Sequence, residues 1–202
     1  MKKQILVIHG GDTFNTHKDY VDFLKNLKID FEKFKIKRWK DTLGEKLGED
    51  FEVISPKMPN SMNAKYNEWK IMFDKLLPFL SDNIILIGHS LGGIFLAKYL
   101  SENIFPKKIL ATFLIAAPYN GENQDHSLGD FVLSGSLEKF QEQGGKIFIY
   151  NSKDDPVVQF DNSERYKYTL PRAVRVEFED RGHFDQIEFP ELIKNIHKLY
   201  SN

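Results

Sequence analysis

A serine between glycines follows one of the apolar runs of the chain. The run Asn83–Ile87 leads into Gly88–Gly93, a G-x-S-x-G pattern centred on Ser90, and a helical pattern of apolar residues begins directly after it. A serine at the tip of so tight a strand-to-helix turn has a strained backbone, and the residues two before and two after it approach too closely for a side chain. The turn therefore predicts that Ser90 is a nucleophile with an exposed hydroxyl.

Two later loops offer the acid and the base that a serine nucleophile needs. Asp154 and Asp155 follow the fifth apolar run, and His183 follows the sixth. Because the carboxyl ends of parallel strands meet at one sheet edge, both loops are expected to open beside Ser90. The histidine would take the proton of the hydroxyl, and the carboxylate would orient the imidazole ring. The chain order predicts a catalytic triad of Ser90, His183 and one of the two aspartates.

Backbone N–H groups suited to binding an oxyanion are expected at the same edge. Leu91 begins the helix after Ser90, and Gly11 lies in the glycine-rich segment that ends the first apolar run. Acyl transfer needs such preset donors for the developing negative charge. We therefore expect the amides of Gly11 and Leu91 to form the oxyanion hole.

Two further histidines would lie near these groups. His89 precedes the serine and would point away from it across the turn, so we interpret it as structural. His9 stands beside a glycine in the loop after the first run, and we expect it to brace that loop rather than to act as a base.

Six short apolar runs alternate with amphipathic stretches along the chain. Most are unbroken blocks of Ile, Leu, Val and Phe, as is typical of parallel strands covered on both faces, whereas the last alternates with charged residues as an edge strand would. This β-α-β-α order predicts an α/β fold, a doubly wound, mostly parallel six-stranded sheet with helices on both faces. The runs are Gln4–Ile8, Phe51–Ser55, Asn83–Ile87, Ile109–Ala116, Lys146–Tyr150 and Ala173–Glu179.

The connection between the first two runs is longer than one crossover helix requires. It holds two amphipathic pieces, one between Val21 and Leu27 and one over Trp39–Leu47. A basic cluster between Lys33 and Lys40 is flanked by acidic residues, so we interpret it as a solvated helical face and not as a nucleic-acid site.

Composition excludes several other classes of protein. The 202 residues suit one domain. With 28 Lys and Arg against 29 Asp and Glu, the net charge of −1 gives no field that would attract nucleic acid or anionic lipid. The absence of cysteine excludes disulfides, thiolate catalysis and cysteine-based metal sites. No apolar run approaches the ~20 residues that span a bilayer, and the first is too short for a signal peptide, so we expect a cytoplasmic protein.

Together, these motifs resemble those of the α/β-hydrolases. The resemblance is narrower to the small serine hydrolases that include the YdeN-like bacterial proteins and the retinoblastoma-binding serine hydrolase. The motifs that carry it are His9-Gly10, Gly88–Gly93, Asp155–Val158, Gly182–Phe184, Met58–Asn60 and Tyr66–Trp69.

The resemblance implies a minimal α/β-hydrolase fold without a large lid. It implies a single domain over residues 1–202 with a helical insertion around residues 15–36. In this family the triad acid is followed by one residue and then an apolar pair, which favours Asp155 over Asp154.

The activity that the resemblance implies is hydrolysis of carboxylic esters, or of thioesters or amides, through an acyl-enzyme intermediate. It needs no cofactor or metal, and its partner would be a small-molecule ester with a small or exposed acyl group. Two alternatives stay open: an acyltransferase that uses the same triad, and a non-catalytic binding module whose insertion presents a surface to a protein partner. No nucleic-acid or membrane partner is expected.

Overall fold

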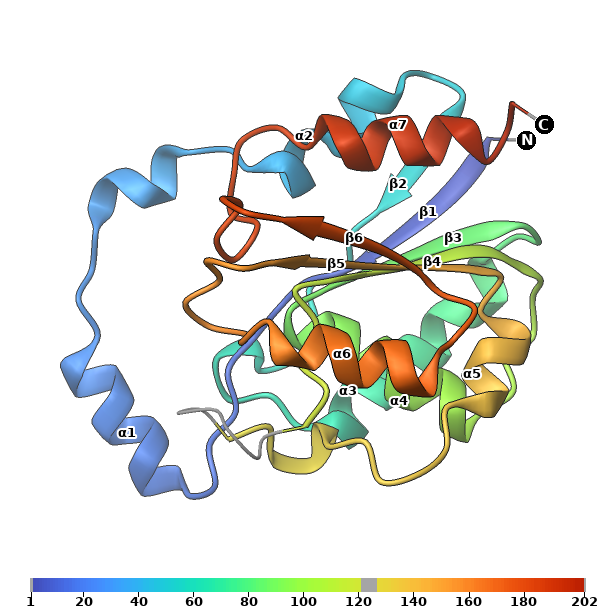
Figure 1. Cartoon of the computed structure of the whole chain (residues 1–202). Helices are drawn as coiled ribbons and strands as arrows, with labels where there is room; N and C mark the ends of the chain where they lie inside the picture. Colours follow the sequence, from blue (N-terminus) through green and yellow to red (C-terminus); the bar gives the residue numbers. More distant parts are fainter. Residues whose placement is uncertain (1, 121–126, 202) are drawn as a thin grey trace.

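The six apolar runs form the six strands of one parallel sheet in the order β2-β1-β3-β4-β5-β6 (Figure 1). The computed structural model describes residues 2–120 and 127–201. The predicted fold class is confirmed, and β6 lies at an edge as its alternating pattern predicted. The strands are β1 Lys3–Ile8, β2 Phe51–Ile54, β3 Ile84–His89, β4 Ile109–Ile115, β5 Lys146–Ser152 and β6 Val174–Phe178.

Helices cover both faces of the sheet. Helices α2 and α7 pack on one face, and α3, α4, α5 and α6 pack on the other (Figure 1). Within the described residues, no helix is long and apolar enough to cross a membrane. The helices are α1 His17–Asn26, α2 Trp39–Leu47, α3 Tyr66–Leu76, α4 Leu91–Glu102, α5 Glu138–Gln143, α6 Asp161–Thr169 and α7 Pro190–Lys198, with 3₁₀ turns at Phe31–Lys35, Ser61–Asn63, Leu77–Phe79 and Gly129–Phe131.

The two layers explain why the strand sequences are apolar without interruption. Successive side chains of a strand point to opposite faces, and here both faces meet a helix layer. Ile5 and Val7 of β1 therefore pack with Trp39 of α2, whereas Leu6 packs with Trp69 of α3 on the other side.

Two helical elements differ from the sequence predictions. Helix α6 was not predicted, because its sequence is mostly polar and Tyr166 is its only large buried apolar side chain. The apolar residues Tyr66, Trp69, Phe73, Leu76 and Leu80 share one helical face in the sequence and predict a helix from Tyr66 to Leu80, but α3 ends at Leu76 and continues as a 3₁₀ turn that contains Pro78. Proline has no N–H to donate to the preceding turn of an α-helix, which accounts for the change.

The segment 15–36 lies outside the two helix layers. It contains α1 and the 3₁₀ turn Phe31–Lys35, and it arches away from the sheet before it returns at α2 (Figure 1). A capping box starts α1, because Thr16 Oγ1 accepts from the Asp19 amide and the Asp19 carboxylate accepts from the Thr16 amide. No side chain of α1 is fully buried.

The strand order reverses between β1 and β3. In doubly wound sheets, ligands bind in the crevice at the carboxyl ends of the strands that flank such a reversal. The carboxyl end of β1 leads to Gly11, and that of β3 leads to Ser90. The topology therefore places the predicted nucleophile and one predicted oxyanion donor at this crevice.

Candidate active site

Ser90 occupies a strained turn between β3 and α4. Its φ of 54° and ψ of −123° are rare for a residue with a side chain. The Ser90 amide donates to Ile115 O at 2.8 Å, and the Gly93 amide donates to Ser90 O at 2.8 Å. Such a backbone conformation costs on the order of 1–3 kcal/mol and persists only where its surroundings fix it.

The glycines on either side of Ser90 are required by space. A Cβ on Gly88 would lie 2.4 Å from the carbonyl oxygen of Gly92, and a Cβ on Gly92 would lie 2.3 Å from that of Ile8. Both distances are far inside van der Waals contact with backbone atoms that cannot move aside. The prediction that no side chain fits at either position is confirmed.

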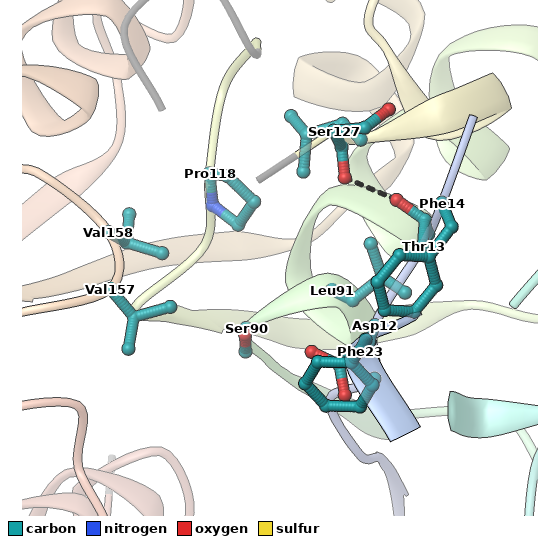
Figure 2. Close-up of a pocket in the computed structure, with 12 residues that line it drawn as sticks. Asp12, Thr13, Phe14, Phe23, Ser90, Leu91, Pro118, Ser127, Val157 and Val158 are labelled. Atoms are coloured by element: carbon teal, nitrogen blue, oxygen red, sulfur yellow. Dashed lines mark hydrogen bonds between the residues drawn. The ribbon is translucent and has the colours of Figure 1, made fainter. Parts of the chain in front are cut away.

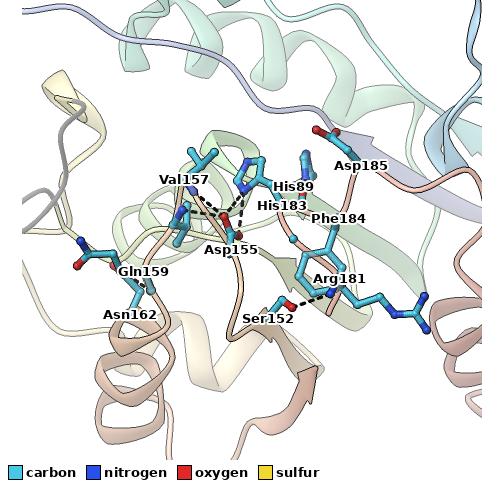
Figure 3. A network of polar contacts seen from close by, with 12 residues as sticks. His89, Ser152, Asp155, Val157, Gln159, Asn162, Arg181, His183, Phe184 and Asp185 are labelled. Atoms are coloured by element: carbon cyan, nitrogen blue, oxygen red, sulfur yellow. Dashed lines mark hydrogen bonds and ion pairs between the residues drawn. The ribbon is translucent and has the colours of Figure 1, made fainter. Parts of the chain in front are cut away.

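Asp155 and His183 are in direct contact (Figure 3). His183 Nδ1 lies 3.0 and 3.1 Å from the two carboxylate oxygens of Asp155. The carboxylate also accepts from the amides of Val157 and Val158 at 2.8 and 2.9 Å, and its side chain is only 2% exposed. Since a carboxylate accepts and does not donate, Nδ1 carries the proton and Nε2 is left as the basic nitrogen.

Asp154 binds a different set of groups. It accepts from the Ser152 hydroxyl at 2.5 Å and from the Gly182 amide at 2.8 Å. These hydrogen bonds, that from Ser152 foremost, lower the pKa of the Asp154 carboxyl. Asp154 therefore fixes the loop that precedes His183, and of the two aspartates it is Asp155 that contacts the histidine.

The structure brings the Asp155–His183 pair and Ser90 to the same sheet edge without joining them. Across residues 2–120 and 127–201, neither the Ser90 hydroxyl nor His183 Nε2 has a hydrogen-bond partner. Catalytic hydrogen bonds of this kind often tighten only once a substrate is bound.

The predicted oxyanion donors flank Ser90. Among the described residues, neither the Gly11 amide nor the Leu91 amide donates to another protein group. The segment that carries Gly11 is pinned on its far side, because the Asp12 amide donates to Ser61 O and Asp12 O accepts from the Ala64 amide, both at 2.8 Å. Both N–H groups are therefore without a protein acceptor in this part of the chain, as the predicted oxyanion hole requires.

His9 braces this segment, as predicted. Its Nε2 accepts from the Met58 amide at 2.8 Å, which leaves Nδ1 to donate to Gly10 O at 2.6 Å. The indole N–H of Trp69 donates to Pro59 O in the same loop at 2.8 Å. Both ring nitrogens of His9 are thus occupied by backbone groups.

A cavity of about 180 Å³, here called the Ser90 cavity, lies beside Ser90. In Figure 2, Val157 and Val158 lie on one side of Ser90, and Leu91, Asp12 and Phe23 lie on the other. Its lining includes two aromatic residues that no sequence motif indicates, Phe14 just before the segment 15–36 and Phe23 within it. No spacing in the sequence connects them to the motif around Ser90.

The N-terminus of α2 binds the loop that follows His183. The Trp39 amide donates to Gln186 O at 3.1 Å, and its indole N–H donates to Phe184 O at 2.8 Å. Arg38 forms an ion pair with Asp185 in the same loop. Helix α2 therefore holds the backbone on the carboxyl side of His183.

His89 and Lys40 extend this contact to His183 itself. Lys40 Nζ lies 3.0 Å from His89 Nδ1, and His89 Nε2 lies 2.8 Å from His183 O. An ammonium only donates, so Nδ1 accepts and Nε2–H donates to the carbonyl. Burial, with Lys40 and His183 nearby, lowers the pKa of His89 well below its usual value. The ring is therefore neutral, and its two nitrogens connect the Lys40 ammonium to the His183 carbonyl.

The structural role predicted for His89 is confirmed, and one part of the prediction for the basic cluster is wrong. Lys35 and Lys37 are exposed, as a solvated face requires, but Lys40 is only partly exposed and faces His89. Burial lowers the pKa of Lys40 to about 8. The charge pattern could not show which lysine is partly buried, because the lysines of the cluster look alike in the sequence. What distinguishes Lys40 is its contact with His89.

The chain is similar to known hydrolases over most of its length. The model of the serine hydrolase family matches residues 31–189. Serine hydrolase RBBP9 of Rattus norvegicus is 27% identical over 157 residues, which cover 74% of this chain and 78% of that protein. Hydrolase YdeN of Bacillus subtilis is 23% identical over 186 residues, with 91% and 87% covered. The crystal structure of the ydeN gene product matches with a TM-score of 0.74 at 19% identity over the full length of both chains.

Proposed function

The chain belongs to the serine hydrolase family, and on that premise we propose that it hydrolyses carboxylic esters through an acyl-enzyme intermediate on Ser90. The observation that carries the proposal is the hydrogen-bonded pair of Asp155 and His183 at the sheet edge where Ser90 ends its strand. A base oriented by a buried carboxylate is what a serine hydroxyl needs in order to act as a nucleophile at neutral pH.

In the first half-reaction, Ser90 Oγ bonds to the acyl carbon and its proton passes to His183 Nε2. The carbonyl oxygen becomes an oxyanion and accepts from the Gly11 and Leu91 amides. Asp155 keeps its hydrogen bond to Nδ1 and stabilises the imidazolium. When the tetrahedral intermediate collapses, the bond to the leaving oxygen breaks and that oxygen takes the proton from Nε2.

In the second half-reaction, water takes the place of the alcohol. His183 Nε2 accepts a proton from the water as its oxygen bonds to the acyl carbon, and the same two amides stabilise the new oxyanion. Collapse releases the carboxylic acid and returns the proton to Ser90 Oγ.

The size of the Ser90 cavity supports a small acyl group. Its volume of about 180 Å³ is below the roughly 300–1,000 Å³ of pockets that enclose a drug-sized ligand. We propose short or compact acyl esters as substrates, ahead of long lipid chains.

A Ser90→Ala variant tests the assignment. We expect it to lose labelling by a fluorophosphonate probe and to lose esterase activity by several powers of ten, on the order of 10⁶ in kcat, while the melting temperature does not fall. Ser101→Ala is the matched control, because the Ser101 hydroxyl donates to Lys98 O within α4, and it should be labelled like the wild type.

The other outcomes separate the alternatives. Labelling of Ser90→Ala would show that another residue is the nucleophile. A wild-type chain that does not react with the probe would favour a binding module. Transfer of the acyl group to an added alcohol in preference to water would favour an acyltransferase.

A further inference from the structure

One side chain of α1 reaches the Ser90 cavity. Phe23 is partly buried although α1 has no fully buried side chain, and it lines the cavity together with Ser90 and Leu91 (Figure 2). Its ring packs against Phe14, with 5.1 Å between the ring centroids, and Phe14 lines the same cavity. Two aromatic rings therefore border the space next to the proposed nucleophile.

The cavity lies on the acyl side of the proposed reaction. The leaving oxygen must lie against His183, because His183 delivers its proton. Among the described residues, those that line the cavity include Ser90, Gly11 and Leu91 but not His183. A group bound there is consequently attached to the carbonyl carbon and not to the leaving oxygen.

The lining of the cavity suits a compact apolar group. Apolar surface comes from the two phenylalanines and from Leu128, Pro118, Val157 and Val158, while Asp12, Thr13 and Ser127 make part of the lining polar. The Thr13 hydroxyl at the cavity already donates to Ser127 O (Figure 2). Aromatic rings attract other rings in edge-to-face or offset geometry beyond the effect of simple burial.

This wall lies outside the part of the chain that matches the serine hydrolase family. The match covers residues 31–189, which include Ser90, Asp155 and His183 but neither Phe14 nor Phe23. The residues proposed to perform the chemistry therefore lie in the matched part, while this wall of the cavity comes from the part before it.

We infer that Phe23 of α1 is a specificity-determining residue that selects esters whose acyl group carries a compact aromatic ring. The inference rests on the proposed esterase function and adds the substrate class to it. Phe23 presents its ring to the ring of the acyl group, while the Phe14 ring packs against Phe23 in the same wall of the cavity.

The test compares two p-nitrophenyl esters that share a leaving group, the acetate and the phenylacetate. We expect the wild type to favour the phenylacetate in kcat/KM. In Phe23→Ala, the ratio of phenylacetate to acetate should fall by about five- to tenfold. Phe23→Leu keeps an apolar side chain without a ring, and we expect it to lose most of the same preference.

Leu24→Ala is the matched control. Leu24 is the next residue of α1, is 39% exposed and is not one of the residues that line the cavity. Both rates and the melting temperature should match the wild type in this variant.

The inference would be overturned if Phe23→Ala left the ratio of phenylacetate to acetate kcat/KM unchanged, or if it lowered kcat/KM equally for both esters. It would also be overturned if Phe23→Leu kept the wild-type ratio. Failure of the proposed function is a separate result: the wild type would then neither hydrolyse either ester nor react with the fluorophosphonate probe.

Discussion

The connection between β1 and β2 contains two helices that are attached to the rest of the molecule in opposite ways. Helix α2 buries Trp39 to 2% exposure and hydrogen-bonds through it to the loop after His183. Helix α1 has no fully buried side chain and reaches the Ser90 cavity with Phe23. The loop that follows His183 is therefore held by a packed, hydrogen-bonded helix, while one wall of the Ser90 cavity comes from a helix without a fully buried side chain.

This difference has energetic consequences. Fully burying a large apolar side chain contributes roughly 1.5–3 kcal/mol, and α2 buries Trp39, Leu43 and Leu47. The segment that contains α1 instead leaves several apolar side chains in solvent, so it gains little from burial. Among these exposed residues are Leu24, Leu27, Ile29, Phe31, Phe34 and Ile36. We expect substitutions in α2 to change the stability of the protein and those on the surface of this segment to leave it almost unaltered.

The largest effect is expected from Trp39→Ala. Removal of this ring leaves a cavity between α2 and the sheet, and it leaves Phe184 O without its donor. We expect the free energy of unfolding to fall by about 3–5 kcal/mol and the melting temperature by roughly 10 °C, as measured by urea and thermal denaturation.

Phe34→Ala is the control for Trp39→Ala from the other region. Phe34 is 74% exposed, so the same kind of truncation removes almost no buried surface. A loss of less than about 1 kcal/mol in Trp39→Ala would contradict the view that α2 is the anchored helix of the pair, because such a loss is typical of a surface site.

A smaller effect is expected from Lys40→Met, on activity. Methionine keeps the apolar stem but cannot donate to His89 Nδ1, so the link from His89 to His183 O loses its support. Misplacement of a catalytic group by about 1 Å can cost on the order of 10²-fold in rate, and we expect a fall of about tenfold in kcat for p-nitrophenyl acetate. An unchanged kcat would show that His89 holds His183 without Lys40.

The same variant should also change how stability depends on pH. Burial lowers the pKa of Lys40 in the folded state to about 8 from 10.5, while Asp185 and Asp41 oppose the shift and Arg38 adds to it. Between these two pKa values the unfolded state binds more protons, so the free energy of unfolding rises with pH from about 8 to 10.5. Lys40→Met should lack this rise when both proteins are unfolded in urea over that range. An identical pH dependence would contradict a lowered pKa of Lys40 in the folded state.

The contrast between the two helices also shows what a sequence alone can predict. All six strands follow from continuous apolar runs, and α2 follows from the spacing of Trp39, Leu43 and Leu47, because burial on a regular face leaves a periodic signal. The positions of Ser90 and His183 at one sheet edge follow from glycine spacing and from their places at strand ends, while their catalytic roles stay a prediction. The place of Phe23 at the Ser90 cavity and the contact of Lys40 with His89 could not be predicted in this way, since they involve residues far away in the chain. Helix α6 was missed because little of it is apolar.

The smallest effect is expected from Phe34→Ser, which tests the loosely attached region itself. The Phe34 side chain is 74% exposed and does not line the Ser90 cavity, so its replacement alters neither the buried core nor the proposed acyl pocket. We expect the free energy of unfolding to change by no more than about 0.5 kcal/mol, and kcat/KM for both p-nitrophenyl esters to stay within twofold, or about 0.4 kcal/mol, of the wild-type value. Urea denaturation and the two ester assays measure these quantities.

A loss of more than about 1 kcal/mol, or of several-fold in either rate, would show that Phe34 is packed in the folded enzyme, because surface positions do not produce such losses. The two helices would then differ in degree only.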